Sequence, residues 1–173
     1  AAAAATVSLG GQLTAGVAIA FANSVDKVPG TVSTGAVTLG FTSATAVPIG
    51  GKITLALPMG YFSAVDSTKL NTAKNAGSTI GSLTATCVRT AGTVGTAVLG
   101  IASADTVVCT TAGALMPTGV NVLTLIAGAV TTGTPQAAAT FNVQTSVDLL
   151  LATAAATVAL GVFQLTAGVA IAF

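Results

Sequence analysis

The chain contains one ten-residue segment twice. Residues 12–21 read QLTAGVAIAF, and residues 164–173 repeat them without a change. In an extended strand, successive side chains point to opposite sides, so this segment has one face of large apolar side chains and one of small ones. A chain with two such strands can fill its own hydrophobic groove with one and offer the other to a neighbour. The large residues, which we expect to mediate assembly, are Leu13, Val17, Ile19 and Phe21 in the first copy and Leu165, Val169, Ile171 and Phe173 in the second.

The duplication continues upstream of the ten identical residues. AATVSLG at 4–10 parallels AATVALG at 155–161, and the offset between the copies changes from 151 to 152 residues. A period of this length is one whole domain, which predicts an extension at 1–11, one domain at 12–163 and the second strand copy at 164–173. Three origins remain open: a longer tandem array, a subunit with a donor segment, and an artificial duplication.

Charged side chains are rare in this chain. Among 173 residues there are five Lys or Arg and four acidic residues, whereas 53% are hydrophobic. Soluble domains normally carry about a quarter charged residues. So little charge leaves little repulsion between molecules, and a free monomer should be poorly soluble. We therefore expect the main partner to be further copies of the same chain.

The composition argues against several function classes. The chain has no His, and its four acidic residues are all Asp. The usual general base, the commonest metal ligand and His-activated nucleophiles are thus missing, and we predict neither an enzyme nor a cofactor. A net charge of +1 with one Tyr and no Trp offers no phosphate track or base-stacking surface, so nucleic acid is not an expected partner.

Short apolar segments with period-two alternation recur along the chain, separated by Gly and Pro. Seven to nine strands at this spacing favour an all-β antiparallel β-sandwich. Residues 63–77 break the alternation and predict a surface loop. Besides 12–21, the expected strands lie at 35–43, 52–57, 82–89, 93–101, 106–111, 119–130, 138–147 and 157–173.

The two cysteines, Cys87 and Cys109, each lie in one of these alternating segments. Neighbouring strands can bring them together in a disulfide. By closing the loop between them, this disulfide would stabilise the fold by about 3 kcal/mol on the chain-entropy model, and it indicates an extracellular protein. Two buried free thiols are the alternative, because Cys packs well as a small hydrophobe.

A membrane location is the alternative to this extracellular one. Residues 149–173 have no charge, and their length could span a bilayer as a helix. The chain is charge-poor everywhere, however, no Lys or Arg flanks this stretch closely, and half of it copies a segment near the start, so we do not expect a membrane protein. The alanine-rich beginning has no basic region and is not typical of a retained signal peptide, which favours a secreted chain whose signal has been removed.

Three further kinds of surface chemistry can be assessed from the sequence. Asp26 and Asp66 lie in expected loops where a calcium ion could bind, but each is solitary in the sequence, which favours solvated loop charges. The many Thr and Ser residues suit strands and also allow O-linked glycans. Regular Thr ladders would indicate an ice-binding face, and here they are sporadic.

Two stretches resemble Ig-like β-sandwich repeats of large extracellular and cell-surface proteins. In 35–62 the resemblance rests on a turn and the strand after it, and in 120–148 on a strand ending in TFNVQTSVD. It implies an Ig-like fold in a secreted, structural setting, with no catalytic site to carry over. The residues that carry it are Pro48, Gly50, Gly51, Ile53, Leu55, Pro58 and Tyr61 in the first stretch and Phe141, Val143, Thr145 and Asp148 in the second.

Together these features predict an Ig-like β-sandwich whose terminal strand is exchanged with a neighbouring subunit. The predicted function is a structural subunit or repeat of an extracellular, pilus-like filament, a homopolymer assembled by donated strands. The analogy to donor-strand filaments rests on the way the subunits would be joined and not on a sequence match. A cell-surface adhesin or S-layer-type module is the alternative, for which 63–77 would have to supply the ligand-binding loop.

Overall fold

A computed structural model describes residues 11–69, 71–75, 83–149 and 155–161. This part of the chain contains one short 3-10 helix and otherwise strands, turns and loops, so the prediction of an all-β fold is confirmed. The elements are β1 (Thr14–Phe21), η1 (Ser24–Lys27), β2 (Val37–Ser43), β3 (Lys52–Pro58), β4 (Phe62–Val65), β5 (Asn71–Asn75), β6 (Leu83–Thr90), β7 (Ala104–Ala112), β8 (Gly119–Leu125), β9 (Val130–Thr132), β10 (Thr140–Thr145) and β11 (Ala155–Ala156).

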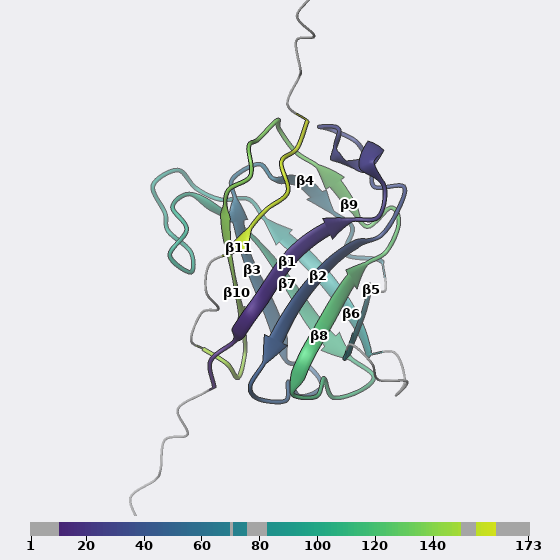
Figure 1. Ribbon diagram of the computed structural model, residues 1–173, viewed down its shortest axis with the longest axis vertical. Coiled ribbons are helices and arrows are strands. Elements are labelled where there is room, and N and C mark those ends of the chain that lie inside the picture. Colours follow the sequence, from purple (N-terminus) through teal and green to yellow (C-terminus); the bar gives the residue numbers. More distant parts are fainter. Residues whose placement is uncertain (1–10, 70, 76–82, 150–154, 162–173) are drawn as a thin grey trace, which may run out of the picture.

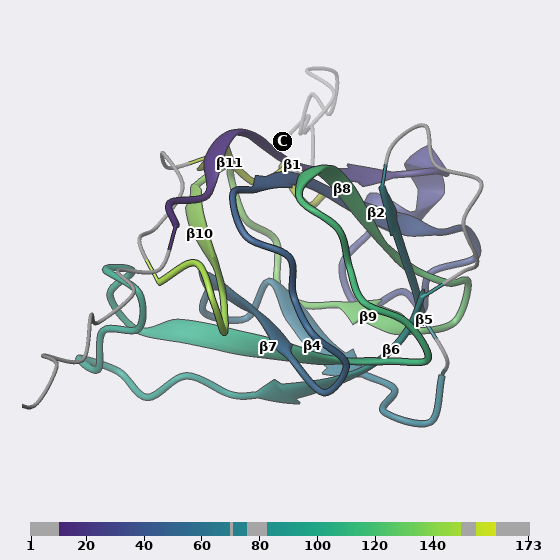
Figure 2. The same cartoon turned by 90° about the horizontal axis from the view of Figure 1, so that it is seen from below.

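Nine of these strands form one antiparallel sheet in the order β1-β2-β8-β5-β6-β7-β3-β10-β11. The sheet curls, so that β1, β2 and β8 face β6 and β7 across the interior (Figures 1 and 2). Its two edge strands, β1 and β11, come into contact with each other. A separate pair, β4 and β9, lies near the end of the molecule where β1 finishes (Figure 1).

The alternation of apolar residues directs one face of each strand into the enclosed core. In β2 every second residue is buried, beginning with Val37 and continuing through Leu39 and Phe41. β7 alternates likewise from Thr106, which places Val107 and Cys109 in the interior. Because side chains alternate with period two, the pattern that predicted the strands also fixes which face of each is buried.

Three sequence-based expectations about elements were wrong. Residues 93–101, expected as a strand, form a loop whose only ladder contact is the isolated bridge between Val98 and Ile101. Residues 63–77, expected as a loop, contribute to β4 and β5, with a turn between them. The expected strand 119–130 is split into β8 and the start of β9 by a turn at 126–129. Alternation alone cannot locate a turn that contains apolar residues, since Ala127 and Ala129 follow Leu125 at the same spacing of two.

All four aspartates accept backbone N–H groups of loops. The buried Asp105 accepts hydrogen bonds from the N–H of Gly60 (2.9 Å) and of Gly92 (2.7 Å) and forms an ion pair with Arg89 at 2.7 Å. In the turn after β4, Asp66 accepts from the N–H and hydroxyl of Thr68, and these bonds lower the pKa of Asp66. Asp26 and Asp148 do the same for loops at opposite ends of β1, described below. Solvated loop charge was therefore the wrong interpretation for Asp26, whose side chain is fully buried.

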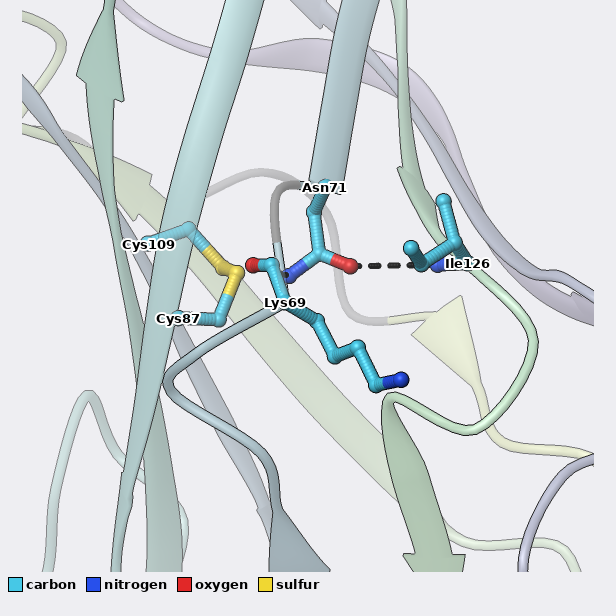
Figure 3. Close-up of a disulfide and its surroundings, with 5 residues drawn as sticks. All are labelled: Lys69, Asn71, Cys87, Cys109 and Ile126. Atoms are coloured by element: carbon cyan, nitrogen blue, oxygen red, sulfur yellow. Dashed lines mark hydrogen bonds between the residues drawn. A yellow bond between two sulfur atoms is a disulfide. The ribbon is translucent and has the colours of Figure 1, made fainter.

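Cys87 and Cys109 form a disulfide between β6 and β7, as predicted, at directly opposed positions of the ladder. Figure 3 shows Asn71 of β5 lying between this disulfide and the turn after β8. The Asn71 side chain accepts a hydrogen bond from the N–H of Ile126 (3.1 Å) and donates one to the carbonyl of Lys69. The disulfide thus lies in the buried interior, beside the polar contact that holds β5 against β8.

The stretch 149–173, considered above as a membrane span, lies mostly outside the described residues. In the part of the chain that the structure describes, no helix is long and apolar enough to cross a bilayer.

Removal of the disulfide is expected to destabilise the domain. The bridge joins residues 22 apart in the sequence, so the double variant Cys87→Ala/Cys109→Ala should lose about 3 kcal/mol of unfolding free energy on the chain-entropy model. Urea unfolding of the parent with and without reductant, beside the double variant, measures this loss. Equal midpoints in all three would show that the bridge does not constrain the unfolded chain.

Candidate functional site

The first copy of the repeated segment occupies the outer edge of β2. In β1, Ile19 lies opposite Leu39 and Phe21 opposite Val37, in an antiparallel ladder. Ile19 is 5% exposed and Leu13, just before the strand, is 1% exposed, whereas Ala18 and Ala20 face solvent. We call the surface that receives 12–21, made by β2 and the core beneath it, the β2 seat. Among the described side chains of this segment, Leu13 and Ile19 are buried and the alanines at 18 and 20 are exposed, which is the alternation of an extended strand.

The ladder between β1 and β2 is irregular in the first half of β1. The step of four residues from Thr14 to Ala18 lies opposite a step of only two, from Thr42 to Gly40. Because the excess is an even number of residues, Leu13 and Ile19 still point to the same face. Val17 lies within this irregular part, and its side chain is outside the described ones.

The predicted assembly residues are thus only partly located. Leu13 and Ile19 are in the core, and Phe21 packs against it with its ring 6.5 Å from that of Phe62. The four residues of the second copy lie outside the described residues: Leu165, Val169, Ile171 and Phe173.

The segment that leads into the second copy occupies a different site, along β10. β11 pairs with the start of β10, and Leu160 continues the pairing by exchanging two backbone hydrogen bonds with Gln136, of 2.9 and 3.0 Å. Leu160 is fully buried, and so is Tyr61, whose hydroxyl donates to the carbonyl of Val158 at 2.9 Å. Burial raises the pKa of Tyr61, so its hydroxyl keeps this proton. We call this site the β10 seat.

The chain enters the β2 seat at one end of the molecule and leaves the β10 seat at the opposite end. Gly11, which leads into β1, lies beside Ala44, Thr45 and Asp148, whereas Gly161, which ends the β10 seat, lies beside Pro29 in the loop after β1. In Figure 1 the described chain accordingly begins at the bottom (dark purple) and finishes at the top (yellow). We call the end with Gly11 the proximal end and the end with Pro29 the distal end.

The entrance of the β2 seat is too tight for a side chain at position 11. A Cβ on Gly11 would lie 2.6 Å from Oδ1 of Asp148, 2.7 Å from Cβ of Ala44 and 2.8 Å from Oγ1 of Thr45. Asp148 is fully buried, and its other oxygen accepts the N–H groups of Ala44 (3.0 Å) and Thr45 (3.2 Å), which fixes this wall. In the second copy the corresponding position is Phe163. The identity of the two copies therefore begins at the residue that follows the tight entrance.

At the distal end, the loop between β1 and β2 is held by Asp26. Its carboxylate accepts hydrogen bonds from the N–H and hydroxyl of Thr34 (2.8 and 2.7 Å) and from the N–H of Gly35 (2.8 Å). The Thr34 N–H is the largest of the influences that lower the pKa of Asp26, and burial acts in the opposite direction. The ionised carboxylate thus fixes residues 24–35 as a compact loop beside Gly161.

Sequence reasoning missed the β10 seat and the two carboxylates that shape the ends. A short stretch such as 155–161 has too few alternating residues to reveal its partner. The available signal for the carboxylates was an Asp among Gly, Thr and Ser in a chain with almost no charge, because such an Asp accepts backbone N–H groups readily.

Other kinds of site find little support in the geometry. A cavity of about 10 Å³ beside Ile19, lined by apolar side chains including Leu55 and Phe62, is about as large as one water and is a packing gap. Among the described residues, no three His, Cys, Asp or Glu side chains are grouped where they could hold a metal ion.

Substitution of Gly11 by Ala is expected to weaken the hold of the β2 seat on the chain's own segment. The added Cβ would overlap the wall made by Ala44, Thr45 and Asp148, at a cost of about 1–3 kcal/mol typical of overpacking. Thermal unfolding measures the effect, with Gln12→Ala at the exposed neighbouring position as the control. Equal melting temperatures for Gly11→Ala and the parent would show that the wall yields.

The distal loop is expected to lose stability in acid. Because the folded-state pKa of Asp26 is lowered below its unfolded value of about 3.9, its contribution is fully present above that value and is lost as the pH falls through the folded-state pKa. Asp26→Asn should melt at a lower temperature at pH 7 and should show a smaller further decrease between pH 5 and pH 2. Lys27→Ala is the control, and a parent-like acid profile for Asp26→Asn would contradict the assignment.

Comparison with known protein families, curated proteins and solved structures found no match to this chain. The resemblance to Ig-like repeats is therefore a similarity of short motifs, and the positions of the two seats carry the argument about function.

Proposed function

We propose that this protein is a structural subunit or repeat of an extracellular filament, joined to its neighbours by a donated β-strand. Residues 155–161 stay in the β10 seat of their own copy, and residues 164–173 enter the β2 seat of the next copy. The donated strand has the sequence of the strand that fills this seat in the structure, so the same large side chains are buried and the same small ones exposed.

One observation carries this proposal: the two seats have their open ends at opposite ends of the molecule. The β10 seat ends at Gly161 on the distal side, and the β2 seat begins on the proximal side, at least about 17 Å away at the strand rise for the five steps from Val37 to Thr42, which lie opposite β1. Only residues 162 and 163 separate Gly161 from Gln164, and these allow about 11 Å. In the orientation of β1, residues 164–173 therefore cannot reach the β2 seat of their own chain, but they can reach that of another copy.

The free energy available in the β2 seat suits this role. Leu13 and Ile19 are almost completely buried, and each buried aliphatic side chain contributes about 1.5–3 kcal/mol by transfer from water. An unoccupied seat would expose this groove together with an unpaired edge of β2, and such edges bind further strands.

The curled sheet also supports a specific fold type for this all-β chain, an Ig-like sandwich. Two groups of strands face one another across one core, and the turn and strand motifs of 48–61 and 141–148 resemble those of Ig-like repeats. The buried disulfide supports an oxidising, extracellular setting. Exposed Thr and Ser residues would be available for O-linked glycans.

The adhesin or S-layer-type alternative would need an exposed loop for a foreign ligand. Residues 63–77 serve poorly, because much of this stretch lies in β4 and β5. The loop at 91–103, which projects from the body in Figure 1 and carries the 77% exposed Val94, would be the better location.

Deletion of 164–173 is the direct test. The shortened chain should remain folded but form monomers or short oligomers, and Ile171→Asp in the full chain should do the same, because position 171 corresponds to the buried Ile19. Ala170→Asp is the matched control, since position 170 corresponds to Ala18, which faces solvent. Negative-stain microscopy and sedimentation measure polymer length. If the shortened chain forms filaments of parent length, strand donation is wrong.

A further inference from the structure

The distal end presents a group of exposed valines. Val25, Val28 and Val32 are 59%, 53% and 53% exposed, although aliphatic side chains are normally buried. They lie within the loop that Asp26 holds through Thr34 and Gly35, so their positions are fixed. Pro29, beside which the β10 seat ends, lies in the same loop.

The proximal end carries a corresponding group from three different loops. Ile49, Leu115 and Leu149 are 63%, 54% and 59% exposed. The loops of Ile49 and Leu115 are tied together by two hydrogen bonds of 2.9 Å between Val47 and Met116. The loop of Leu149 is joined to residues 44 and 45 through the carboxylate of Asp148.

We propose that these two apolar ends contact one another, so that the distal end of each copy packs on the proximal end of the next. This inference rests on the strand donation proposed above. Val25, Val28 and Val32 of one copy would lie against Ile49, Leu115 and Leu149 of its neighbour, and the partner is a second copy of this chain.

The length of the linker forces such an approach. A strand that leaves the β10 seat beside Pro29 and enters the β2 seat beside Ala44 and Thr45 has two residues between the seats, or about 11 Å. The exposed valines adjoin the exit from the β10 seat of one copy, and the loop of Ile49 adjoins the entrance to the β2 seat of the next copy. These two sets of loops would therefore meet. When one surface of each copy binds a different surface of the next, the contact can be repeated from copy to copy. Such repetition builds an open filament unless the copies close into a ring.

The energetics of exchange also require a contact of this kind. In the structure the chain's own residues 12–21 fill the β2 seat, and residues 164–173 have the same sequence. Within these ten residues, replacement of one by the other leaves the number and kind of strand contacts unchanged, and at the tight entrance Phe163 in place of Gly11 would cost free energy. What favours the filament over the separate chain must therefore come from surfaces that meet only between copies, and burial of exposed apolar side chains supplies it.

Charge gives a way to test the contact. Lys27 lies in the distal loop among the exposed valines, and Lys52 begins β3 at the proximal end. Val28→Lys/Val32→Lys would bring further positive charge against the proximal end and should lower the polymerised fraction at least tenfold, as measured by sedimentation. Adding Ile49→Asp/Leu115→Asp to the same chain should restore it. Val88→Lys is the matched control, because Val88 is 54% exposed on β6, away from both ends.

The outcomes separate this inference from strand donation. If Val28→Lys/Val32→Lys polymerises like the parent, or if the added aspartates restore nothing, the end contact is wrong, and the deletion of 164–173 still tests donation by itself. If the parent forms no filaments, both proposals fail. Should the distal variant prove misfolded by circular dichroism, Ile49→Lys/Leu115→Lys makes the same test from the proximal end.

Discussion

A β-sheet that does not close on itself has two edges, and each exposes a row of backbone groups that can bind another strand. In the described part of this chain, the edges are β1 and β11, which meet where the sheet curls round. Both belong to the duplicated stretch: 12–21 provides one edge and 155–161 the other. The duplicated segments thus form both edges of the sheet, where β1 and β11 meet and where a further strand could be added. Every other strand is paired on both sides or, like β4 and β9, packed at the end of the core.

Much of the fold could be predicted from the sequence because alternation and burial are two expressions of the same geometry. The strands with strict alternation, such as β2, β3 and β7, lie close to where the pattern placed them. The pattern failed at 93–101, where apolar residues alternate in a loop, and at Asn71, a polar residue that is buried because it bonds Ile126. The residue type does not show whether a polar side chain bonds to a buried protein group or to water. Only the three-dimensional contacts distinguish these two cases.

For the candidate site, the sequence indicates which face of the first strand copy is apolar but not the direction in which the segments run. The sequence indicates that Leu13 and Ile19 are buried together, since both lie on one face of a strand. It does not indicate that 155–161 runs towards the end of the molecule opposite to the start of β1, because this depends on how many strands lie between them in the sheet. Gly11 illustrates the same limit. Its lack of a side chain matters only because Asp148, 137 residues further along the chain, forms the wall beside it.

The positions of the aspartates have a consequence for the outside of the molecule. Asp26, Asp105 and Asp148 are buried, and the chain contains no His and no Glu. Among the described acidic side chains, only Asp66 is left partly in contact with solvent. The charged side chains left at the described surface are therefore mostly lysines, and an assembly made from this protein should present a sparse positive charge to its surroundings.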